Sequence, residues 1–332
     1  MISFYPGPSK VYSQSLDFIQ EAYELGFPSY NHRSSIFMNV YQDIQSLIKD
    51  RWDLPEDYHI AFTSSATESW EIFIQSFSYG NRLNLYSGAF GEKWGNYYSE
   101  NCLNKSIYEE NNSELNFDTV SLVHSETSNG SMNIPKRNSF KNAIIGVDAT
   151  SSMGGMLLPW KEADFWLASV QKCMGMPAGL GLIIYNKNAI LKARSKNFYN
   201  DLCFIEENRL KNQTQNTPNG LMIYVFKRLL ETLPHLQEIH QSTLAKSRMI
   251  EEFMKNKFEY IIPDKSKRLP TVHAFSIEKD KLSNFLSNIE KENIILGKGY
   301  GKWKDSSFRI ANFPAHTEND LEKLFSAIER NI

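Results

Sequence analysis

The sequence predicts an α/β fold, with a large domain built on a mostly parallel, mixed sheet and a smaller C-terminal α/β domain. Short apolar runs alternate with segments of helical periodicity through about residue 190, a succession typical of strands joined by crossover helices. Several runs end directly in polar residues, as expected where buried parallel strands reach the sheet edge. From about Leu221 the chain changes to long helical stretches and shorter strands. We therefore expect a large domain over residues 16–230 and a small one over residues 231–332 together with residues 1–15.

The first part of the chain supplies most of the expected strands. Helical spacing of apolar residues predicts helices over 15–23, 37–52 and 67–80. The apolar runs between and after these helices are too short for helices and bounded by polar residues, so they are predicted as strands. The expected strands of the large domain cover residues 60–63, 83–87, 119–124, 143–148, 165–170 and 180–185.

The last third predicts a second, smaller α/β arrangement. A helical stretch runs from Leu221 to Phe258 and is interrupted near Pro234, since proline breaks a helix. Strands are expected over residues 271–277 and 307–310. A closing helix is predicted from Glu318 to Ile328, with Thr317 as its N-cap because a threonine oxygen can accept a first-turn amide hydrogen bond.

Composition excludes several classes of partner. The 332 residues carry a net charge of −2 with Lys and Arg spread along the chain, so neither nucleic acid nor an acidic membrane surface is an expected partner. No apolar run approaches the roughly 20 residues of a membrane span, and the N-terminus lacks the features of a secretory signal. Three cysteines without a CxxC pair predict free thiols in a reducing cytoplasm, and neither a disulfide framework nor a metal site.

Two residues at strand ends suggest the chemistry. Open α/β sheets bind ligands beyond the carboxyl ends of their strands. Asp148 ends one predicted strand, and Lys172 follows another at the start of a turn rich in glycine. A carboxylate that keeps a pyridine nitrogen protonated, next to a lysine that forms an imine, is the pair that pyridoxal phosphate needs. Taken singly, Lys172 reads as a solvated surface lysine and Asp148 as a cap or turn residue; their combination favours the cofactor site.

A third strand end favours a phosphate group. Ser65, Ala66 and Thr67 lie between a predicted strand and a predicted helix, where small residues let backbone amides and the helix dipole hold an anion. A serine or threonine at this place also serves as a plain helix cap. No GxGxxG or GxxxxGK[ST] motif is present, so dinucleotide and ATP binding lack their main support.

With these residues in place, the sequence resembles the class V, fold-type I aminotransferases, and among them the phosphoserine aminotransferases. The resemblance runs from Pro6-Gly7-Pro8-Ser9 to Arg309-Ile310. Its strongest motif is Gln171-Lys172 followed by Gly175, Pro177, Ala178, Gly179 and Leu180, with Asp148-Ala-Thr-Ser-Ser upstream. The related cysteine desulfurases typically carry histidine before the lysine, so Gln171 argues against membership of that group.

The resemblance implies a role for each site residue. Lys172 would form the imine and Asp148 would hold the pyridine nitrogen. Phe90 would stack on the cofactor ring, where relatives often have Trp, and Thr127 would bond the ring hydroxyl. The phosphate contacts would be Ala66, Thr67, Gln171 and, from the second subunit of a homodimer, Asn216 and Thr217; Ser65 is expected beside them from its place before the helix.

Three further residues are implied for the substrate. Arg309 resembles the arginine that grips the α-carboxylate, since a guanidinium fork suits a carboxylate. His32 and Arg33 resemble the pair that binds a substrate phosphate across the dimer, although glyoxylate aminotransferases carry a similar pair. Many phosphoserine enzymes have arginine where Thr67 stands, and a His-Arg pair where this chain has Lys302-Trp303-Lys304. Either one or both lysines substitute, or the pocket does not bind phosphate.

The expected activity is therefore a pyridoxal-phosphate-dependent transamination of small amino and keto acids. The first hypothesis is transfer between glutamate and 3-phosphohydroxypyruvate, giving 2-oxoglutarate and phosphoserine for serine biosynthesis. The alternative enzyme is an alanine- or serine-glyoxylate type aminotransferase. The alternative of another class is a binding protein that kept the fold without catalysis, against which the intact Lys172, Asp148 and Arg309 argue.

Overall fold

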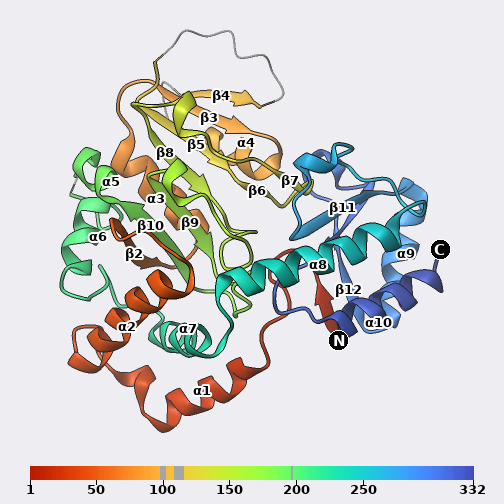
Figure 1. Ribbon diagram of the computed structural model, residues 1–332, viewed down its shortest axis with the longest axis horizontal. Coiled ribbons are helices and arrows are strands. Elements are labelled where there is room, and N and C mark those ends of the chain that lie inside the picture. The colour runs from red at the N-terminus through yellow and green to blue at the C-terminus, as the bar shows by residue number, and fades with distance from the viewer. Residues whose placement is uncertain (98–101, 108–115, 196) are drawn as a thin grey trace.

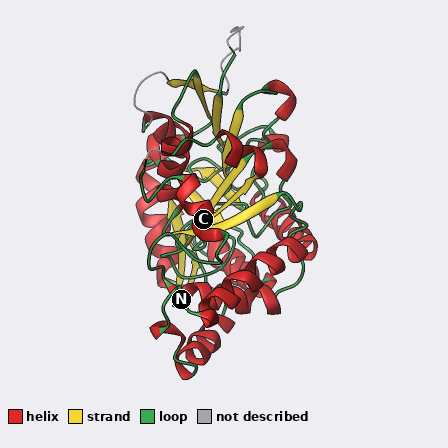
Figure 2. Cartoon of the chain, turned by 90° about the vertical axis from the view of Figure 1, so that its left-hand side faces the viewer, coloured by secondary structure: helices red, strands yellow, loops and turns green. Residues whose placement is uncertain are grey.

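The computed structural model describes residues 1–97, 102–107, 116–195 and 197–332. The described chain builds a seven-stranded sheet and a separate four-stranded sheet (Figure 1). Figure 2 shows strands in the interior with helices around them. The seven-stranded sheet comes from residues 58–186, whereas the four-stranded sheet combines the N-terminal strand with three strands of the last third of the chain.

The large sheet has the strand order β2-β10-β9-β8-β5-β3-β4. Its strands are β2 (Tyr58–Thr63), β3 (Arg82–Tyr86), β4 (Cys102–Ser106), β5 (Thr119–Val123), β8 (Ile144–Asp148), β9 (Phe165–Ser169) and β10 (Gly181–Asn186). The pairings from β4 through β9 are parallel, while β10 runs antiparallel to both β9 and β2. The short connection from β9 to β10 explains this direction, because a parallel return needs a longer crossover.

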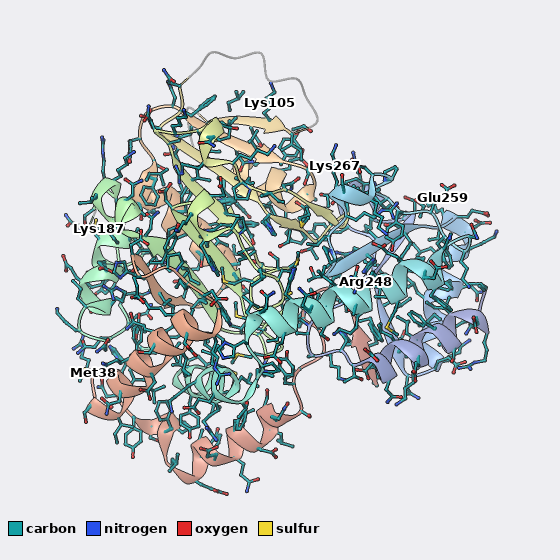
Figure 3. All side chains as sticks on the ribbon, viewed as in Figure 1. Met38, Lys105, Lys187, Arg248, Glu259 and Lys267 are labelled. Atoms are coloured by element: carbon teal, nitrogen blue, oxygen red, sulfur yellow. The ribbon has the colours of Figure 1, made fainter. Side chains whose placement is uncertain are left out.

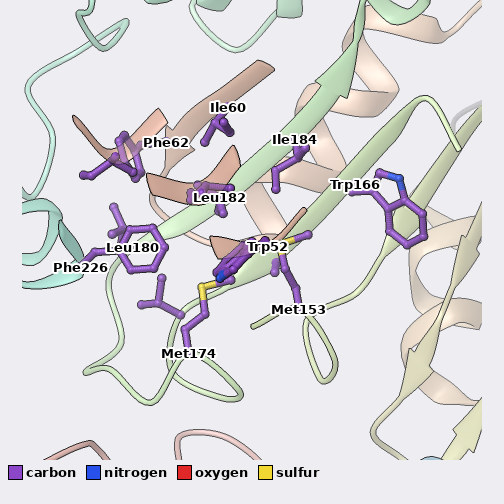
Figure 4. Packing of buried hydrophobic residues seen from close by; sticks show 14 of the residues in the cluster. Trp52, Ile60, Phe62, Met153, Trp166, Met174, Leu180, Leu182, Ile184 and Phe226 are labelled. Carbon is purple, nitrogen blue, oxygen red and sulfur yellow. The ribbon is translucent and has the colours of Figure 1, made fainter. Parts of the chain in front are cut away.

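Helices cover both faces of the large sheet. On one face lie α1 (Gln14–Glu24), α2 (Ser35–Arg51) and α7 (Gly220–Thr232), which pack together. Their apolar side chains join one buried cluster with the sheet, seen in Figure 4 around Trp52, Phe62 and Phe226. The other face is covered by α3 (Ala66–Phe77), α4 (Ala89–Asn96), α5 (Lys187–Lys192) and α6 (Leu202–Arg209). The sheet is therefore the middle of three layers, which fixes its strand ends in space.

The four-stranded sheet has the order β1-β12-β13-β11 and its own core. Its strands are β1 (Ile2–Phe4), β11 (Val272–Ser276), β12 (Ile294–Lys298) and β13 (Ser307–Ala311), and its helices are α8 (Leu236–Met254), α9 (Lys279–Lys291) and α10 (Glu318–Glu329). A two-stranded ribbon, β6 (Ser125–Glu126) with β7 (Ser131–Met132), lies toward this unit in Figure 1. We call residues 1–10 and 236–332 the C-terminal unit.

The predicted fold class is confirmed, and most predicted elements are present. All strands predicted for the large sheet occur within two residues of their expected bounds, and the sheet is mostly parallel. Thr317 caps α10 in a capping box with Asp320. The division at residue 230 stays a prediction.

Several sequence-based bounds were wrong. The helix predicted to reach Gly80 ends at Phe77, because Gly80 has a φ of +61° that a helix does not allow. The helix predicted to reach Phe258 ends at Met254, before Asn256 at a φ of +64°. The predicted strand pattern also missed β1, β4 and β12, and the helices α4 to α6 and α9 were not expected.

In the described ranges, no helix is long and apolar enough to cross a membrane. Cys102, Cys173 and Cys203 are unpaired. No group of three or more His, Cys, Asp or Glu side chains in the same ranges could hold a metal ion.

Candidate active site

A cavity of about 230 Å³ lies beyond the carboxyl ends of the central parallel strands. The last residues of β5, β8 and β9 line it, namely Val123, Asp148 and Ser169. This is the edge at which an open α/β sheet is expected to bind its ligand. Eight of the residues predicted from the sequence line this cavity: Ala66, Thr67, Phe90, Thr127, Asp148, Gln171, Lys172 and Arg309. We call it the cofactor cavity.

Lys172 is held inside the cavity by two hydroxyl groups. Its Nζ donates to Thr127 Oγ1 at 2.8 Å and to Ser151 Oγ at 3.0 Å. Those two hydroxyls also bond each other at 2.6 Å. The side chain is only 9 % exposed, and burial lowers the pKa of Lys172 to about 8, with nearby Arg309 adding to the shift and Asp148 opposing it. A lysine of this kind reaches its neutral, nucleophilic form much closer to neutral pH than an exposed lysine does.

Asp148 ends β8 with both carboxylate oxygens held. Oδ1 accepts the backbone N–H of Thr150 at 2.8 Å, and Oδ2 accepts the indole N–H of Trp70 at 2.8 Å. Burial raises the pKa of Asp148, while the two donors and the positive charge of Lys172 act in the opposite direction. These contacts fix the carboxylate in a single orientation at the cavity wall.

The start of α3 offers backbone donors to the cavity. Ser65 is the N-cap, and its hydroxyl accepts the N–H of Glu68. It does not line the cavity, so its side chain acts here as a cap, while Ala66 and Thr67 do line it. The first amides of a helix have no partner within the helix and carry the positive end of its dipole. The N–H of Ala66 already donates to Ser169 Oγ at 2.6 Å, so this end of the cavity offers an anionic group the amide of Thr67 and the positive end of the helix dipole.

Phe90 forms the aromatic wall of the cavity. It lies in the first turn of α4, whose N-terminal amides are held by the buried carboxylate of Glu126: Gly91 donates to it at 3.0 Å. Lys172 Nζ lies 5.4 Å from the centroid of the Phe90 ring. Tyr300, from the loop after β12, stacks on Phe90 with centroids 4.7 Å apart and planes at 10°. An aromatic face is thus presented beside the reactive amine.

Arg309 places a buried cation in the same cavity. It is 3 % exposed and sits in β13, so it comes from the C-terminal unit. Nε donates to the carbonyl of Lys298 and Nη1 to the carbonyl of Thr127. Within the described ranges no carboxylate lies within ion-pair distance of it, and its Nη2 has no hydrogen-bond partner there. A buried charge without a counter-ion is costly, so an anion beside Arg309 would be stabilised there.

The four remaining predicted residues do not line the cofactor cavity. His32 and Arg33 precede α2, with His32 buried and Arg33 exposed, and burial lowers the pKa of His32. Asn216 and Thr217 are exposed in the segment before α7. Of the two lysines considered as substitutes, Lys302 lines a neighbouring cleft and its Nζ lies 4.7 Å from the Trp303 ring; Lys304 lines neither cavity.

Sequence reasoning missed four residues that shape the site. Ser151 and Trp70 bond the two central residues, as described above. Gly7 approaches so closely that a Cβ there would lie 2.7 Å from Lys172 Cε, and its φ of +124° also requires glycine. Tyr300 closes the cavity from the C-terminal unit. A glycine between two prolines was the only one of these with a visible signal, since it marks an unusual backbone.

Larger clefts exist but hold no comparable chemistry. One of about 650 Å³ adjoins the site between the two sheets and is lined by residues that include Glu92, Asp264, Lys267 and Lys302. Figure 3 places Lys267 on the edge of the C-terminal unit that faces the large sheet. Another, of about 1,040 Å³, lies within the C-terminal unit. Of these three cavities, only the cofactor cavity is lined by buried reactive groups of opposite charge, namely Lys172, Arg309 and Asp148. It is therefore the candidate active site.

Comparison with known proteins agrees with this geometry. A curated phosphoserine aminotransferase of Corynebacterium glutamicum is 26 % identical over 351 aligned residues, covering 97 % of this chain and 92 % of the relative. A crystal structure of a phosphoserine aminotransferase from Cytophaga hutchinsonii superposes with a TM-score of 0.90 at 27 % identity, covering 100 % of this chain and 99 % of that one.

A structure with lower sequence identity supports a statement about the fold only. The alanine–glyoxylate aminotransferase from a Nostoc species superposes with a TM-score of 0.84 at 19 % identity, over 99 % of this chain and 94 % of that one. The sequence profile of the family aminotransferase class-V matches residues 108–308, more than half of the chain. This chain therefore belongs to the class-V aminotransferases.

Proposed function

We propose that this aminotransferase uses pyridoxal phosphate to exchange an amino group between glutamate and 3-phosphohydroxypyruvate, forming 2-oxoglutarate and phosphoserine. The observation that carries the proposal is the convergence of Lys172, Asp148 and an unpaired, buried Arg309 on one cavity. The near full-length similarity to curated phosphoserine aminotransferases supports the substrate.

The donors in the cavity fit pyridoxal phosphate. Asp148 offers a fixed carboxylate to a protonated pyridine nitrogen, and Thr127 offers a hydroxyl beside the lysine. Phe90 offers an aromatic ring beside the amine, and the start of α3 offers the amide of Thr67 and the helix dipole to a phosphate. The cavity is below the ~300–1,000 Å³ of drug-sized sites, which suits one small ring. When bound, the cofactor supplies an electron sink that stabilises negative charge at the substrate's α-carbon.

Lys172 is the residue we assign to proton movement. A general base is most effective when its pKa lies near the working pH. Burial gives Lys172 a pKa of about 8. Its Nζ can therefore take a proton from the α-carbon of the amino acid and, in the reverse half-reaction, give a proton back to the α-carbon of the product. The hydroxyls of Thr127 and Ser151 hold Nζ in place and accept its hydrogen bonds while it is charged.

Arg309 is the residue we assign to the α-carboxylate. Its Nε and Nη1 are anchored on backbone carbonyls, which leaves Nη2 and the cation itself for a ligand. A carboxylate held there at a fixed angle places the α-carbon in one position, and such orientation is a large part of the catalytic effect. Because both substrates of a transaminase carry an α-carboxylate, both use this residue.

His32, Arg33, Asn216 and Thr217 are proposed to complete the site of a second subunit. They do not line the cofactor cavity of their own chain, which is compatible with a role in the cavity of another chain. Helix α1 and the residue after it, which precede His32 and Arg33 in the chain, expose the large apolar side chains of Leu16, Tyr23 and Leu25 at 55–71 % exposure. Such a surface is typical of a subunit interface. We propose a homodimer, and a cytoplasmic location that suits its unpaired thiols.

A half-reaction panel tests the proposed activity. The purified protein loaded with pyridoxal phosphate is mixed singly with phosphoserine, glutamate, alanine or serine, and its absorbance spectrum is followed. We expect phosphoserine and glutamate to convert the spectrum. Conversion by alanine or serine but not by phosphoserine would instead favour a glyoxylate-type enzyme. Borohydride reduction is the check on catalysis of any kind: no adduct on Lys172 would favour a binding protein.

A further inference from the structure

Asp148 is held by two donors that come from different parts of the fold. The Thr150 amide belongs to the loop that follows β8, so it moves with Asp148 itself. The Trp70 indole comes from α3, far away in the sequence, and donates to Oδ2 at 2.8 Å. Because the two donors act on different oxygens, the carboxylate cannot rotate without breaking one of them.

Trp70 is itself fixed. It is 5 % exposed and stacks on the buried Trp94 of α4, with centroids 5.8 Å apart and planes at 10°. It also lines the cofactor cavity, one turn after Thr67 on the same helix. Helix α3 therefore contributes twice to this site, through the amides of its first turn and through an indole N–H on its second.

We propose that Trp70 is a positioning residue for Asp148. Its indole N–H fixes the carboxylate so that a free lone pair faces the cavity, and the same hydrogen bond stabilises the charged form of the carboxylate. The inference rests on the proposed function, in which Asp148 receives a protonated pyridine nitrogen. A carboxylate offers about four lone-pair sites, and the two donors occupy one on each oxygen. The indole is an uncharged donor, so it stabilises the negative charge without competing with the cofactor as a cation would.

The charged surroundings explain why a neutral donor matters. Burial raises the pKa of Asp148, and Lys172 is the charged group that opposes this shift. Lys93 and Arg309 also line the cavity. Lys172 has a pKa of about 8 and gains and loses a proton in the proposed reaction, so its charge is not constant. The hydrogen bonds of Thr150 and Trp70 remain in both states.

The substitution Trp70→Phe keeps an aromatic ring and removes the N–H. Equilibrium titration of the cofactor-free protein with pyridoxal phosphate, followed by absorbance from pH 5 to 9, is the measurement. A hydrogen bond to a charged group corresponds to about tenfold or more in an equilibrium constant. We expect at least about tenfold weaker binding, and an acid limit of binding that moves up by about one pH unit, since the charged carboxylate loses a donor.

Trp94→Phe is the matched control. Trp94 is fully buried in the same stack, but its indole N–H has no hydrogen-bond partner in the described chain. Its loss should leave cofactor affinity and the acid limit unchanged. Equal losses in both variants would overturn the proposal, because they would reveal a packing effect of the stack.

A second measurement does not depend on the folding of Trp70→Phe. The chain has six tryptophans, so ¹⁵N-indole spectra contain six side-chain signals. We expect Asp148→Asn to shift the Trp70 signal and leave that of Trp94 in place; an unchanged Trp70 signal would overturn the proposal. The same variant separates the two claims. If Asp148→Asn binds the cofactor normally, the assigned role of Asp148 fails; if it binds weakly while Trp70→Phe binds normally, only the role of Trp70 fails.

Discussion

The cofactor cavity and the proposed site for the distal group of the substrate differ in whether a single chain supplies all of their residues. At the cofactor cavity, reactive groups are buried and interlinked, with Lys172, Thr127 and Ser151 within hydrogen-bond distance of one another. At the segments before α2 and α7, Arg33, Asn216 and Thr217 are exposed and do not line the cofactor cavity. The chemistry of transamination can thus be assembled within one chain, whereas recognition of the distal group of the substrate would need a second.

The most severe test of this contrast removes the reactive amine. We expect Lys172→Ala to lower the rate of transamination by at least about 10⁴-fold, the upper range for one general acid–base group. The fold should persist, because the amine lies in a cavity and supports no apolar core. Stopped-flow half-reactions and thermal unfolding measure the two quantities. An active variant, or one that unfolds globally, would contradict the assignment.

Arg309→Gln should act on both substrates alike. Loss of a charge-assisted hydrogen bond to a carboxylate corresponds to about 10–100-fold in binding for each substrate. Steady-state kcat/KM for glutamate and for the keto acid should therefore fall by similar factors. Arg248→Gln is the control, since Arg248 lies on α8 and does not line the cofactor cavity. A fall for only one substrate would mean that Arg309 recognises a side chain.

Arg33→Ala should instead act on one substrate only. We expect KM for the phosphorylated keto acid to rise about tenfold or more, because a charge-assisted hydrogen bond is lost, with little change for glutamate. Mixing this variant with Lys172→Ala then tests the shared site. With random exchange of subunits in a symmetric dimer, about a quarter of the sites should recover. No recovery after verified exchange would place Arg33 in its own chain's site.

The smallest expected effect concerns the hydroxyls around the amine. Acylation of Lys172 in the cofactor-free protein requires the neutral amine, so its rate should rise with pH through a midpoint near 8. Ser151→Ala removes an acceptor of the charged form, so the midpoint should fall by up to about one unit. Mass spectrometry of the labelled peptide measures it. An upward shift would show that Ser151 does not stabilise the ammonium form.

The sequence predicted the parts of the site that follow from strand ends. Asp148 and Lys172 were found because polar residues after buried runs must reach one edge of the sheet, and the structure brings both to one cavity. Trp70 and Ser151 could not be found in this way. A tryptophan at helical spacing reads as core, and one serine among neighbouring hydroxyls has no distinguishing mark. Their partners are set by the register of α3 and by the turn after β8, which only packing determines.

The fold was predictable to a similar depth. Buried strands gave apolar runs, so the central sheet was expected. The antiparallel course of β10 depends on the length of a turn, and β1 is three residues long, too short to show a period. Helix α9 is rich in polar residues and buries only Leu282, Phe285 and Ile289, so its narrow apolar stripe did not stand out.

The pairing of β1 with β12 also bears on how the protein is made. Ile2 lies beside Ile294, so β1 has no strand neighbour until the chain has been synthesised as far as β12. Gly7, a few residues on, packs against Lys172. Contacts so distant in sequence form late and slowly. The segment that covers the lysine pocket is thus synthesised long before its own strand partner, and a nascent chain that stalls before β12 holds the reactive amine without the β1–β12 pairing that anchors this cover.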